Sequence, residues 1–406
     1  MTEHSNDPSK VVVIGGGYAG TLAANRLRMR ADVDITLINP RPKFVERIRL
    51  HQFVARTGDA TIDYGTLLGQ GIELLVDSAT RIDSAARTVQ LASGRTLDYD
   101  YVIYAVGSTA ATLSSVPGAV EFALPLAEFE SAQRLRARLE ELPLDAPVTV
   151  VGGGLTGIET AAELAEQGRM VTLVCGRTLA PSLSAPARRY VAKWLTRHGV
   201  TVLEADVVSE VRPDAVALAN GPGEGSAEGA VRRSALTIWA AGFGVAELAA
   251  ASGLRTDTLG RLLTDETLTS VDNDRIVAAG DAAAPSGRPL RMSGFAAGPL
   301  GARAADTVLS RIAGTEPAVI DLAFTGACVS LGRGAAVRQL ARKDDTAVNV
   351  YVSGRLGAAI KEVTCRFVVS KRIRREARKP GSMGWPKGGP RPEQPSTSAS
   401  QEVTSP

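Results

Sequence analysis

Cysteine and histidine are both scarce in this sequence of 406 residues. The three cysteines, Cys175, Cys328 and Cys365, lie far apart and form no CxxC or CxxxxC pair. We therefore expect no disulfide framework. We expect a reducing, cytosolic setting instead. The three histidines are equally scattered. Because no cluster has the spacing of zinc ligands, we expect no metal site.

A long uninterrupted apolar run is also missing. The longest apolar window, residues 235–254, contains three glycines and Glu247. A membrane-spanning helix needs about 20 mainly apolar residues, and the centre of this window, LTIWAAGFG, instead predicts a buried strand that ends in a loop. The polar start MTEHSNDPSK runs directly into an apolar strand pattern, so we expect no signal peptide.

Charge is nearly balanced at +3 but unevenly placed, with eight Lys or Arg and only two Glu in residues 361–379. Apolar residues at helical spacing precede and enter this segment: Ile360, Val363, Phe367 and Val368. Residues 357–379 therefore predict a basic amphipathic helix, which either lies on an anionic membrane or packs on its own domain. No aromatic platform accompanies the charge, which argues against nucleic-acid binding. The last 27 residues, 380–406, are rich in Pro, Ser and Gly and predict disorder.

Against these absences stand two glycine-rich turns. VVVIGGGYAG begins at residue 11 and VTVVGGGLTG at residue 148, each an apolar run followed by a turn and helix-like sequence. In such a GxGxxG turn the first glycine makes the bend, the second lets the backbone approach a pyrophosphate, and the third allows close helix packing. The phosphates then lie on free N–H groups of the helix N-terminus. Two copies predict two dinucleotide sites, which we call the first glycine turn (Gly15, Gly17, Gly20) and the second glycine turn (Gly152, Gly154, Gly157).

The acidic residue that usually binds the adenosine ribose is missing after both turns. Asn39 follows ITLI, and its carboxamide can still bond ribose hydroxyls, whereas Cys175 follows VTLV and does so poorly. Arg177 lies two residues further on. It either binds a 2′-phosphate, which would favour NADPH, or points to solvent.

Four further stretches extend the pattern: YDYVIYAVG (99–107), ALTIWAAG (235–242), DNDRIVAAGDAAA (272–284) and FTGACVSLGRGAAV (324–337). With them, residues 11–335 resemble the pyridine nucleotide–disulfide oxidoreductase superfamily, and most of all its branch of type II NADH dehydrogenases and apoptosis-inducing-factor-like proteins. The resemblance implies an α/β fold with two Rossmann-like domains, the second inserted in the first, and a small α+β C-terminal domain. The expected boundaries are 1–117 with 262–322 for FAD, 118–261 for NAD(P)H, 323–379 for the C-terminal domain, and 380–406 for the tail.

The resemblance also implies site residues. Asp281 would bind the ribityl chain of FAD, and Arg47, Arg49 and His51 fall in the segment that faces the flavin. Glu159 would lie near the nicotinamide as the catalytic residue, although an acid in the first helical turn would also suit the helix dipole. The residues expected at FAD are Gly15, Gly17, Tyr18, Ala19, Gly20, Asn39, Arg47, Thr80, Ala105, Gly107, Gly280 and Asp281. Those expected at NAD(P)H are Gly152, Gly154, Thr156, Gly157, Glu159, Cys175, Arg177 and Gly242.

The expected function is transfer of hydride from NADH or NADPH to FAD, and then of electrons to a quinone or quinone-like acceptor. Two departures from the family bear on it. The segment PRPKFVERIRLHQF has no cysteine pair, so no dithiol relay is expected, and Phe295 and Leu300 stand near the glutamine positions of the family's quinone stretch. A redox-sensing flavoprotein and a flavin monooxygenase remain as alternatives. These expectations fit a cytoplasmic protein that can bind peripherally at the inner face of the membrane. They are also compatible with a homodimer.

Overall fold

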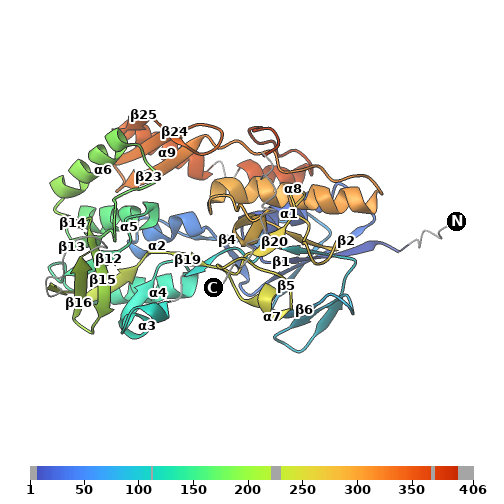
Figure 1. The fold of residues 1–406 in the computed structure, drawn as a ribbon, viewed down its shortest axis with the longest axis horizontal. Helices are drawn as coiled ribbons and strands as arrows, with labels where there is room; N and C mark the ends of the chain where they lie inside the picture. Colours follow the sequence, from blue (N-terminus) through green and yellow to red (C-terminus); the bar gives the residue numbers. More distant parts are fainter. Residues whose placement is uncertain (1–6, 111–112, 221–229, 367–370, 392–406) are drawn as a thin grey trace, which may run out of the picture.

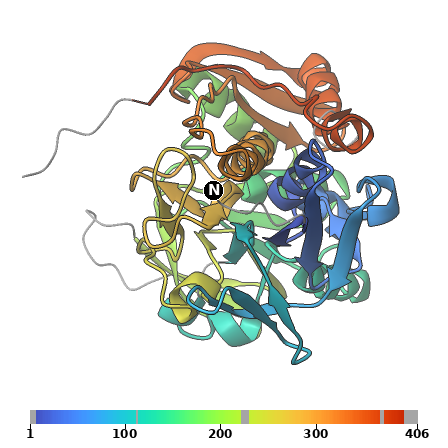
Figure 2. The same ribbon diagram turned by 90° about the vertical axis from the view of Figure 1, so that its right-hand side faces the viewer.

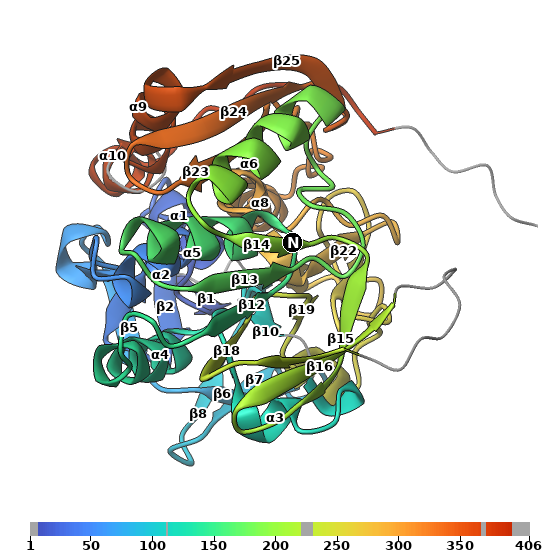
Figure 3. The same ribbon diagram turned by 90° about the vertical axis from the view of Figure 1, so that its left-hand side faces the viewer.

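A computed structural model of the protein describes residues 7–110, 113–220, 230–366 and 371–391. Two parallel sheets flanked by helices form its two halves, and a small antiparallel sheet covers one side of them (Figures 1 and 3). Within the described ranges, no helix combines the length and the apolar character needed to cross a bilayer.

The first parallel sheet orders its strands β21-β9-β1-β2-β5. These strands are β1 (Ser9–Ile14), β2 (Val33–Asn39), β5 (Ile72–Val76), β9 (Tyr101–Tyr104) and β21 (Ile276–Ala278). The apolar run of β1 is buried on both faces, as is typical of a parallel strand covered on both sides. Helices α1 (Tyr18–Leu27) and α8 (Gly294–Ile312) pack against each other beside this sheet.

The second parallel sheet has the order β11-β18-β12-β13-β14. Its strands are β11 (Ala123–Pro125), β12 (Val148–Val151), β13 (Val171–Val174), β14 (Thr201–Leu203) and β18 (Leu236–Trp239). All of them lie in the chain between β9 and β21, so the second sheet is inserted into the first. The predicted α/β class with two Rossmann-like domains is confirmed, whereas the exact boundaries stay predictions.

Helices and a C-terminal sheet surround this frame. The helices beside the second sheet are α4 (Phe129–Glu141), α5 (Leu155–Glu166) and α6 (Ala185–Arg197). The C-terminal sheet, which contacts α5, consists of β23 (Gly326–Leu331), β24 (Ala335–Ala341) and β25 (Ala347–Ser353). Helices α9 (Gly354–Arg366) and α10 (Arg374–Arg378) follow it. Gly357 lets α9 lie directly on β24, because a Cβ there would collide with the Ala336 carbonyl.

Smaller elements complete the chain. The short strands are β3 (Lys43–Val45), β4 (Thr61–Asp63), β6 (Ala79–Asp83), β7 (Thr88–Leu91), β8 (Thr96–Asp98), β10 (Thr109–Ala110), β15 (Asp206–Val211), β16 (Ala215–Asn220), β17 (Val231–Arg233), β19 (Phe243–Gly244), β20 (Leu262–Thr264) and β22 (Ala283–Pro285). The short helices are η1 (Arg47–Arg49), α2 (Leu50–Val54), η2 (Tyr64–Thr66), η3 (Leu113–Ser115), α3 (Ala119–Phe122), α7 (Leu248–Ala251) and η4 (Gly280–Ala282).

The segment after α10 differs from its expectation. Residues 380–391 were expected to be disordered, yet they lie against the first Rossmann half beside α8 (Figure 2). The Trp385 indole N–H donates to the Asp321 carbonyl (2.8 Å), and the Arg391 guanidinium pairs with Glu266 (2.7 Å). Composition missed this because a few specific anchors, rather than an apolar period, hold the segment. Residues 392–406, the rest of the predicted tail, lie outside the described residues.

The start of this segment is anchored through a fully buried carboxylate on α10. Glu376 accepts from the backbone N–H groups of Gly381 and Met383, both at 2.7 Å. It also pairs with Arg26 of α1 at 3.3 Å. Helices α1 and α10 are therefore joined on the first Rossmann half.

Candidate functional site

The two glycine turns share one geometry. Gly15 and Gly152 have φ of +105° and +127°, a region that favours glycine. A Cβ at Gly15 would collide with the Ala105 carbonyl, and one at Gly152 would lie 2.9 Å from the Ala240 carbonyl oxygen. The third glycines, Gly20 and Gly157, pack equally tightly on the first glycine of their own turn. The first and third positions are thus fixed by steric contact within the protein.

The second glycines face open space. A Cβ added at Gly17 or at Gly154 would meet no protein atom within 4 Å, and both residues are exposed. Each is the N-cap of its helix, α1 or α5, and neither cap has a side-chain hydrogen bond. The helix N–H groups therefore remain directed at the space in front of each turn. Both turns fit the pyrophosphate of a dinucleotide.

A cavity of about 360 Å³ opens in front of the first glycine turn. Its wall brings together most residues predicted for FAD: Gly15, Gly17, Tyr18, Ala19, Asn39, Arg47, Ala105, Gly107, Gly280 and Asp281. Gly20 contributes through packing behind the turn. Thr80 lies outside this wall, exposed on β6, and donates to the Gln90 carbonyl (3.2 Å). Among the described residues that line the cavity there is no cysteine.

A polar chain crosses the cavity wall at the end of β9 and the start of η4. The Ser108 hydroxyl donates to Asp281 Oδ2 at 2.7 Å, and Arg47 Nη1 donates to the Ser108 carbonyl at 2.6 Å. Burial lowers the pKa of Arg47, and the Asp281 carboxylate opposes that shift. Sequence reasoning missed Ser108, although its place directly after the AVG turn was a usable signal.

Asn39 serves the first turn itself. Its Oδ1 accepts from the Gly16 N–H at 3.0 Å, and its Nδ2 donates to the Arg41 carbonyl at 2.7 Å. Its contact with a ribose stays a prediction. Arg41 reaches further, with a two-pronged ion pair to Glu130 on α4 (2.6 Å for each hydrogen bond). This pair joins the two Rossmann halves beside the cavity, which α4 borders through Phe129.

The second glycine turn has different neighbours. Cys175 follows β13 and lies against the turn, and burial raises the pKa of its thiol to about 12. Arg177 is exposed. Gly242 has φ of +72°, the same value as Gly107 at the corresponding position of the first half. The Thr156 carbonyl accepts from the Thr160 hydroxyl inside α5 (2.8 Å).

Glu159 does not lie in the first turn of α5, which begins at Leu155, so the helix-dipole explanation is wrong. Instead its carboxylate is buried between domains. Lys361 Nζ of α9 lies 2.7 Å from Oε1, the Ser330 N–H donates to the same oxygen at 2.9 Å, and His51 Nδ1 lies 3.6 Å from Oε2. We call Glu159, Lys361, His51 and Ser330 the interdomain cluster.

The charge states within the interdomain cluster follow from burial and pairing. Burial works to raise the pKa of Glu159, but Lys361 and His51 outweigh it and hold that pKa below its ordinary value. For Lys361, burial works in the lowering direction and the Glu159 carboxylate raises the pKa overall. Burial lowers the pKa of His51 to about 4. At neutral pH the cluster therefore holds one carboxylate, one ammonium and a neutral imidazole.

His198 is the C-cap of α6 and stacks on Trp194 (3.7 Å between ring centroids). The three cysteines are free thiols. In the described part of the chain, no group of three or more His, Cys, Asp or Glu residues is arranged to hold a metal ion.

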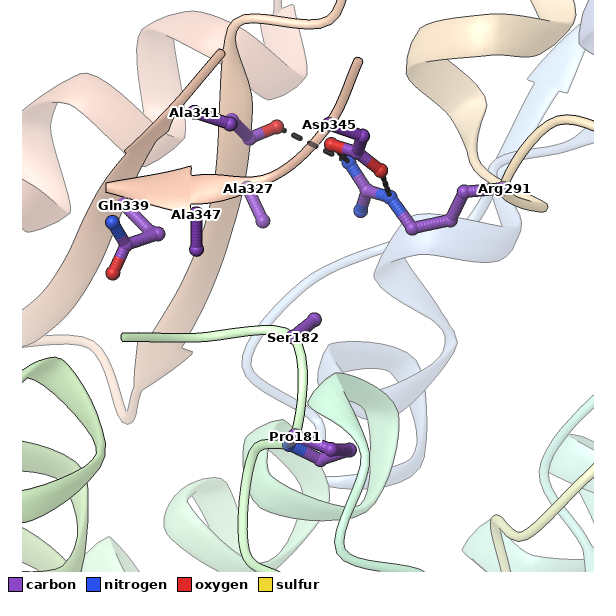
Figure 4. A pocket seen from close by; sticks show the side chains of 9 residues that line it. Pro181, Ser182, Arg291, Ala327, Gln339, Ala341, Asp345 and Ala347 are labelled. Carbon is purple, nitrogen blue, oxygen red and sulfur yellow. Dashed lines mark hydrogen bonds and ion pairs between the residues drawn. The ribbon is translucent and has the colours of Figure 1, made fainter. Parts of the chain in front are cut away.

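A smaller cavity of about 170 Å³ lies between the loop after β13, the C-terminal sheet and the segment before α8. The Arg291 guanidinium and Ser182 lie on opposite sides of it (Figure 4). Arg291 is bound by Asp345 (3.0 Å between Nη2 and Oδ1) and by the Gly326 carbonyl (3.3 Å). These pairs join the first Rossmann half to the C-terminal sheet, so the cavity marks a junction between three parts of the molecule.

Comparison with known proteins agrees with this geometry. Residues 9–304 match the family described as pyridine nucleotide-disulphide oxidoreductase. An NADH dehydrogenase-like protein of Mycobacterium tuberculosis (strain CDC 1551 / Oshkosh) is 31% identical over 68% of this chain and 73% of its own length. A type II NADH:quinone oxidoreductase of M. tuberculosis (strain H37Rv) is 27% identical over 76% of this chain and 74% of its own length.

Among solved structures, NDH2 from Plasmodium falciparum in complex with NADH has the same fold. It covers 91% of this chain and 96% of its own, with a TM-score of 0.77 at 16% identity. The match over residues 9–304, the paired turns and the cavity lead to one assignment. This chain belongs to the pyridine nucleotide-disulphide oxidoreductase family, as an oxidoreductase of its NADH dehydrogenase-like branch that uses FAD and a pyridine nucleotide.

Proposed function

We propose that this protein oxidises NADH through FAD and reduces a quinone. The observation that carries the proposal is the repeated glycine turn, whose first copy faces a cavity of about 360 Å³ lined from both Rossmann halves. A walled site suits a resident cofactor, and the second copy is left for the nucleotide that exchanges in every turnover. When bound, FAD supplies the redox chemistry, because its ring takes hydride from a nicotinamide and passes electrons to an acceptor.

Residues of the first half would orient the cofactor. The N-terminus of α1 faces its pyrophosphate, and Asp281 offers the ribityl hydroxyls an acceptor beside Ser108. Arg47 adds a half-buried positive charge to the same wall. Such a fixed charge favours negative charge that develops nearby during reduction.

The interdomain cluster would manage protons. Reduction of a quinone consumes protons as well as electrons, and Lys361 carries one on Nζ in direct contact with Glu159 (2.7 Å). This ammonium comes from α9, so the C-terminal helix contributes to a cluster that also includes the second Rossmann half. We assign Glu159 the role of fixing Lys361, in addition to any contact with the nicotinamide.

The quinone acceptor is supported by the surface of α9. Leu356 and Val363, which lie on the same face of α9 two turns apart, are 63% and 64% exposed, and Arg355 and Arg366 lie exposed beside them. Apolar side chains flanked by cations suit contact with an anionic membrane, where lipid quinones reside. Ile360 is half-buried. Phe367 and Val368, which also belong to the predicted apolar face, lie outside the described residues.

An anaerobic titration tests this function. The FAD-loaded protein is mixed with NADH, and the flavin absorbance is followed before and after a soluble quinone is added. We expect bleaching by NADH, rapid recovery with quinone, and turnover on the order of 10 per second. Recovery with oxygen but with no quinone would contradict the acceptor, and absence of bleaching by either nucleotide would contradict the donor.

Vesicle sedimentation tests the membrane contact separately. We expect the full chain to sediment with vesicles that contain phosphatidylglycerol and to remain free with phosphatidylcholine alone, because the exposed cations need anionic lipid. The variant Leu356→Ser/Val363→Ser should lose this binding while it keeps its flavin. Equal binding of the variant would show that this face is not the contact.

A further inference from the structure

The second parallel sheet places two side chains next to each other at its carboxyl edge. Strands β13 and β14 are paired in parallel with Val174 opposite Leu203, so the next residue on each strand, Cys175 and Glu204, emerges at the same edge. The Cys175 N–H donates to the Leu203 carbonyl at 2.8 Å, which fixes this register at its last step. This edge is where a Rossmann domain receives the adenosine half of its ligand.

Cys175 stands at the position where the ribose-binding acid is expected. A Cβ added at Gly153, inside the second turn, would lie 2.7 Å from Cys175 Cβ, just as one at Gly16 would lie 3.0 Å from Asn39 Cβ in the first half. The two positions therefore correspond. Asn39 fills the first with a strong hydrogen-bonding group, whereas the Cys175 thiol stays neutral with a pKa of about 12 and bonds weakly.

Glu204 places a carboxylate at the sheet edge where Cys175 has only a thiol. Its Oε2 accepts from the Leu179 N–H at 3.1 Å, which draws the side chain over the loop that follows β13. Its charge acts on Cys175, where it adds to the effect of burial on the thiol pKa. Within the described ranges, no Lys or Arg side chain lies within 4.0 Å of it as an ion-pair partner. The carboxylate therefore remains available to a ligand.

We propose that Glu204 supplies, from the neighbouring strand, the acid that is missing at the end of β13, and thereby selects NADH over NADPH. A carboxylate at this edge accepts from a ribose hydroxyl and repels a 2′-phosphate of charge about −2. Glu204 is thus the specificity-determining residue of the second site. This inference rests on the proposed use of the second glycine turn for NADH.

Arg177 is the competing determinant, because a cation near this edge would favour the 2′-phosphate. It is exposed. A long exposed side chain keeps its charge in water and loses conformational freedom when it binds. Glu204 is already fixed by its bond to Leu179. The structure therefore favours the acid over the arginine.

Calorimetric binding of NAD⁺ and NADP⁺ to the FAD-loaded protein tests the proposal without turnover. We expect the natural protein to bind NAD⁺ more tightly, and Glu204→Gln to lower the ratio of the two affinities by about ten-fold. The amide oxygen of Gln can still accept from Leu179, so the loop is preserved. Arg177→Gln tests the competing determinant in the same assay. Glu141→Gln, at an exposed position on α4, is the matched control and should leave both affinities unchanged.

A double variant guards against a merely structural effect. Asp at position 175 is close in shape to the Asn39 side chain that the first half accommodates at the corresponding place. Cys175→Asp/Glu204→Gln should therefore restore the NAD⁺ preference that Glu204→Gln loses. An unchanged affinity ratio in Glu204→Gln, or NADP⁺ preference that depends on Arg177, would overturn the role of Glu204 alone. Failure of the natural protein to bind either nucleotide would overturn the proposed function as well.

Discussion

The two halves of the molecule contain the same turn in different surroundings. The first and third glycines are equally crowded in both, and the second glycines equally free. The first turn, however, is walled by side chains from both Rossmann halves and joined to α4 through Arg41, whereas Arg177 beside the second turn is exposed. The turn itself therefore specifies only that a pyrophosphate is bound. Its surroundings decide whether the ligand stays or exchanges.

The two helices that follow these turns also differ at one corresponding position. Five residues after the free glycine, α1 carries Leu22, which is buried in the apolar core, and α5 carries Glu159 in the interdomain cluster. The first helix is thus held by apolar packing alone at this point. The second is held by an ion pair that comes from the C-terminal helix, so the nucleotide half depends on α9.

Blocking each turn separately should have the largest effect. A Cβ added at Gly17 or Gly154 meets no protein atom within 4 Å, so the side chain of Gly17→Val or Gly154→Val extends into the space of the pyrophosphate. We expect Gly17→Val to lose FAD affinity at least a thousand-fold, about 4 kcal/mol, and to purify colourless. Gly154→Val should purify yellow but lose NADH binding in calorimetry. A yellow Gly17→Val protein with one flavin per chain would contradict the assignment of the two turns.

Removing one charge of the interdomain cluster should have the next largest effect. Lys361→Met leaves the Glu159 carboxylate buried without its partner, and we expect a loss of about 3 to 5 kcal/mol in the free energy of unfolding by urea. Glu159→Leu/Lys361→Met, which copies Leu22 of the first half, should regain most of this loss. Lys193→Met, at an exposed site on α6, is the control. An equal effect of both single variants would disprove the special role of Lys361.

The pH dependence of stability tests the neutral state of His51. Because its folded pKa of about 4 lies below the ordinary value of 6.5, the unfolded chain binds more protons between these limits. His51 therefore contributes stability that is present above pH 6.5 and is lost as the pH falls to about 4, by up to about 3 kcal/mol. In urea titrations, His51→Gln should show a shallower fall over this range. Parallel curves for both proteins would contradict the burial effect.

Loosening the wall of the first site should have the smallest effect. Glu130→Gln weakens the ion pair with Arg41. The Arg41 side chain is 33% exposed and the Glu130 side chain is 56% exposed. A pair this exposed contributes less than about 1 kcal/mol, so FAD should dissociate measurably faster in fluorescence measurements, but by less than about five-fold. Glu141→Gln, which breaks a pair within α4 away from the cavity, should change nothing. No change with Glu130→Gln would show that α4 does not hold the cofactor in place.

Local sequence was enough for the parts of the site that depend on backbone geometry. The paired turns, the Gly107 and Gly242 exits and the place of Asp281 follow from short motifs, because each needs glycine or an acid at a fixed offset from a strand. The motif was enough to identify Glu159 as a candidate site residue. It did not predict which groups its carboxylate contacts. Its partner Lys361 is 202 residues away, and only folding reveals which of the many C-terminal cations is buried.

The same limit applies to the rest of the chain. Ser108, Glu130 and Glu204 act through contacts between strands or domains, and no periodic pattern marks such residues. Residues 380–391 show the reverse error, because a low apolar content suggested disorder while Trp385 and Arg391 supply specific anchors. Composition indicates only how much apolar surface a segment can bury on average. It does not reveal a segment that a few polar contacts hold in place.

The ion pair between Arg26 and Glu376 has a consequence for biosynthesis. These residues are 350 positions apart, so the first Rossmann half cannot complete this contact until α10 has left the ribosome. The parallel sheet of the second half comes from one continuous stretch and is free to form earlier. Loading of the flavin should therefore await synthesis of α10, with the nucleotide half already folded.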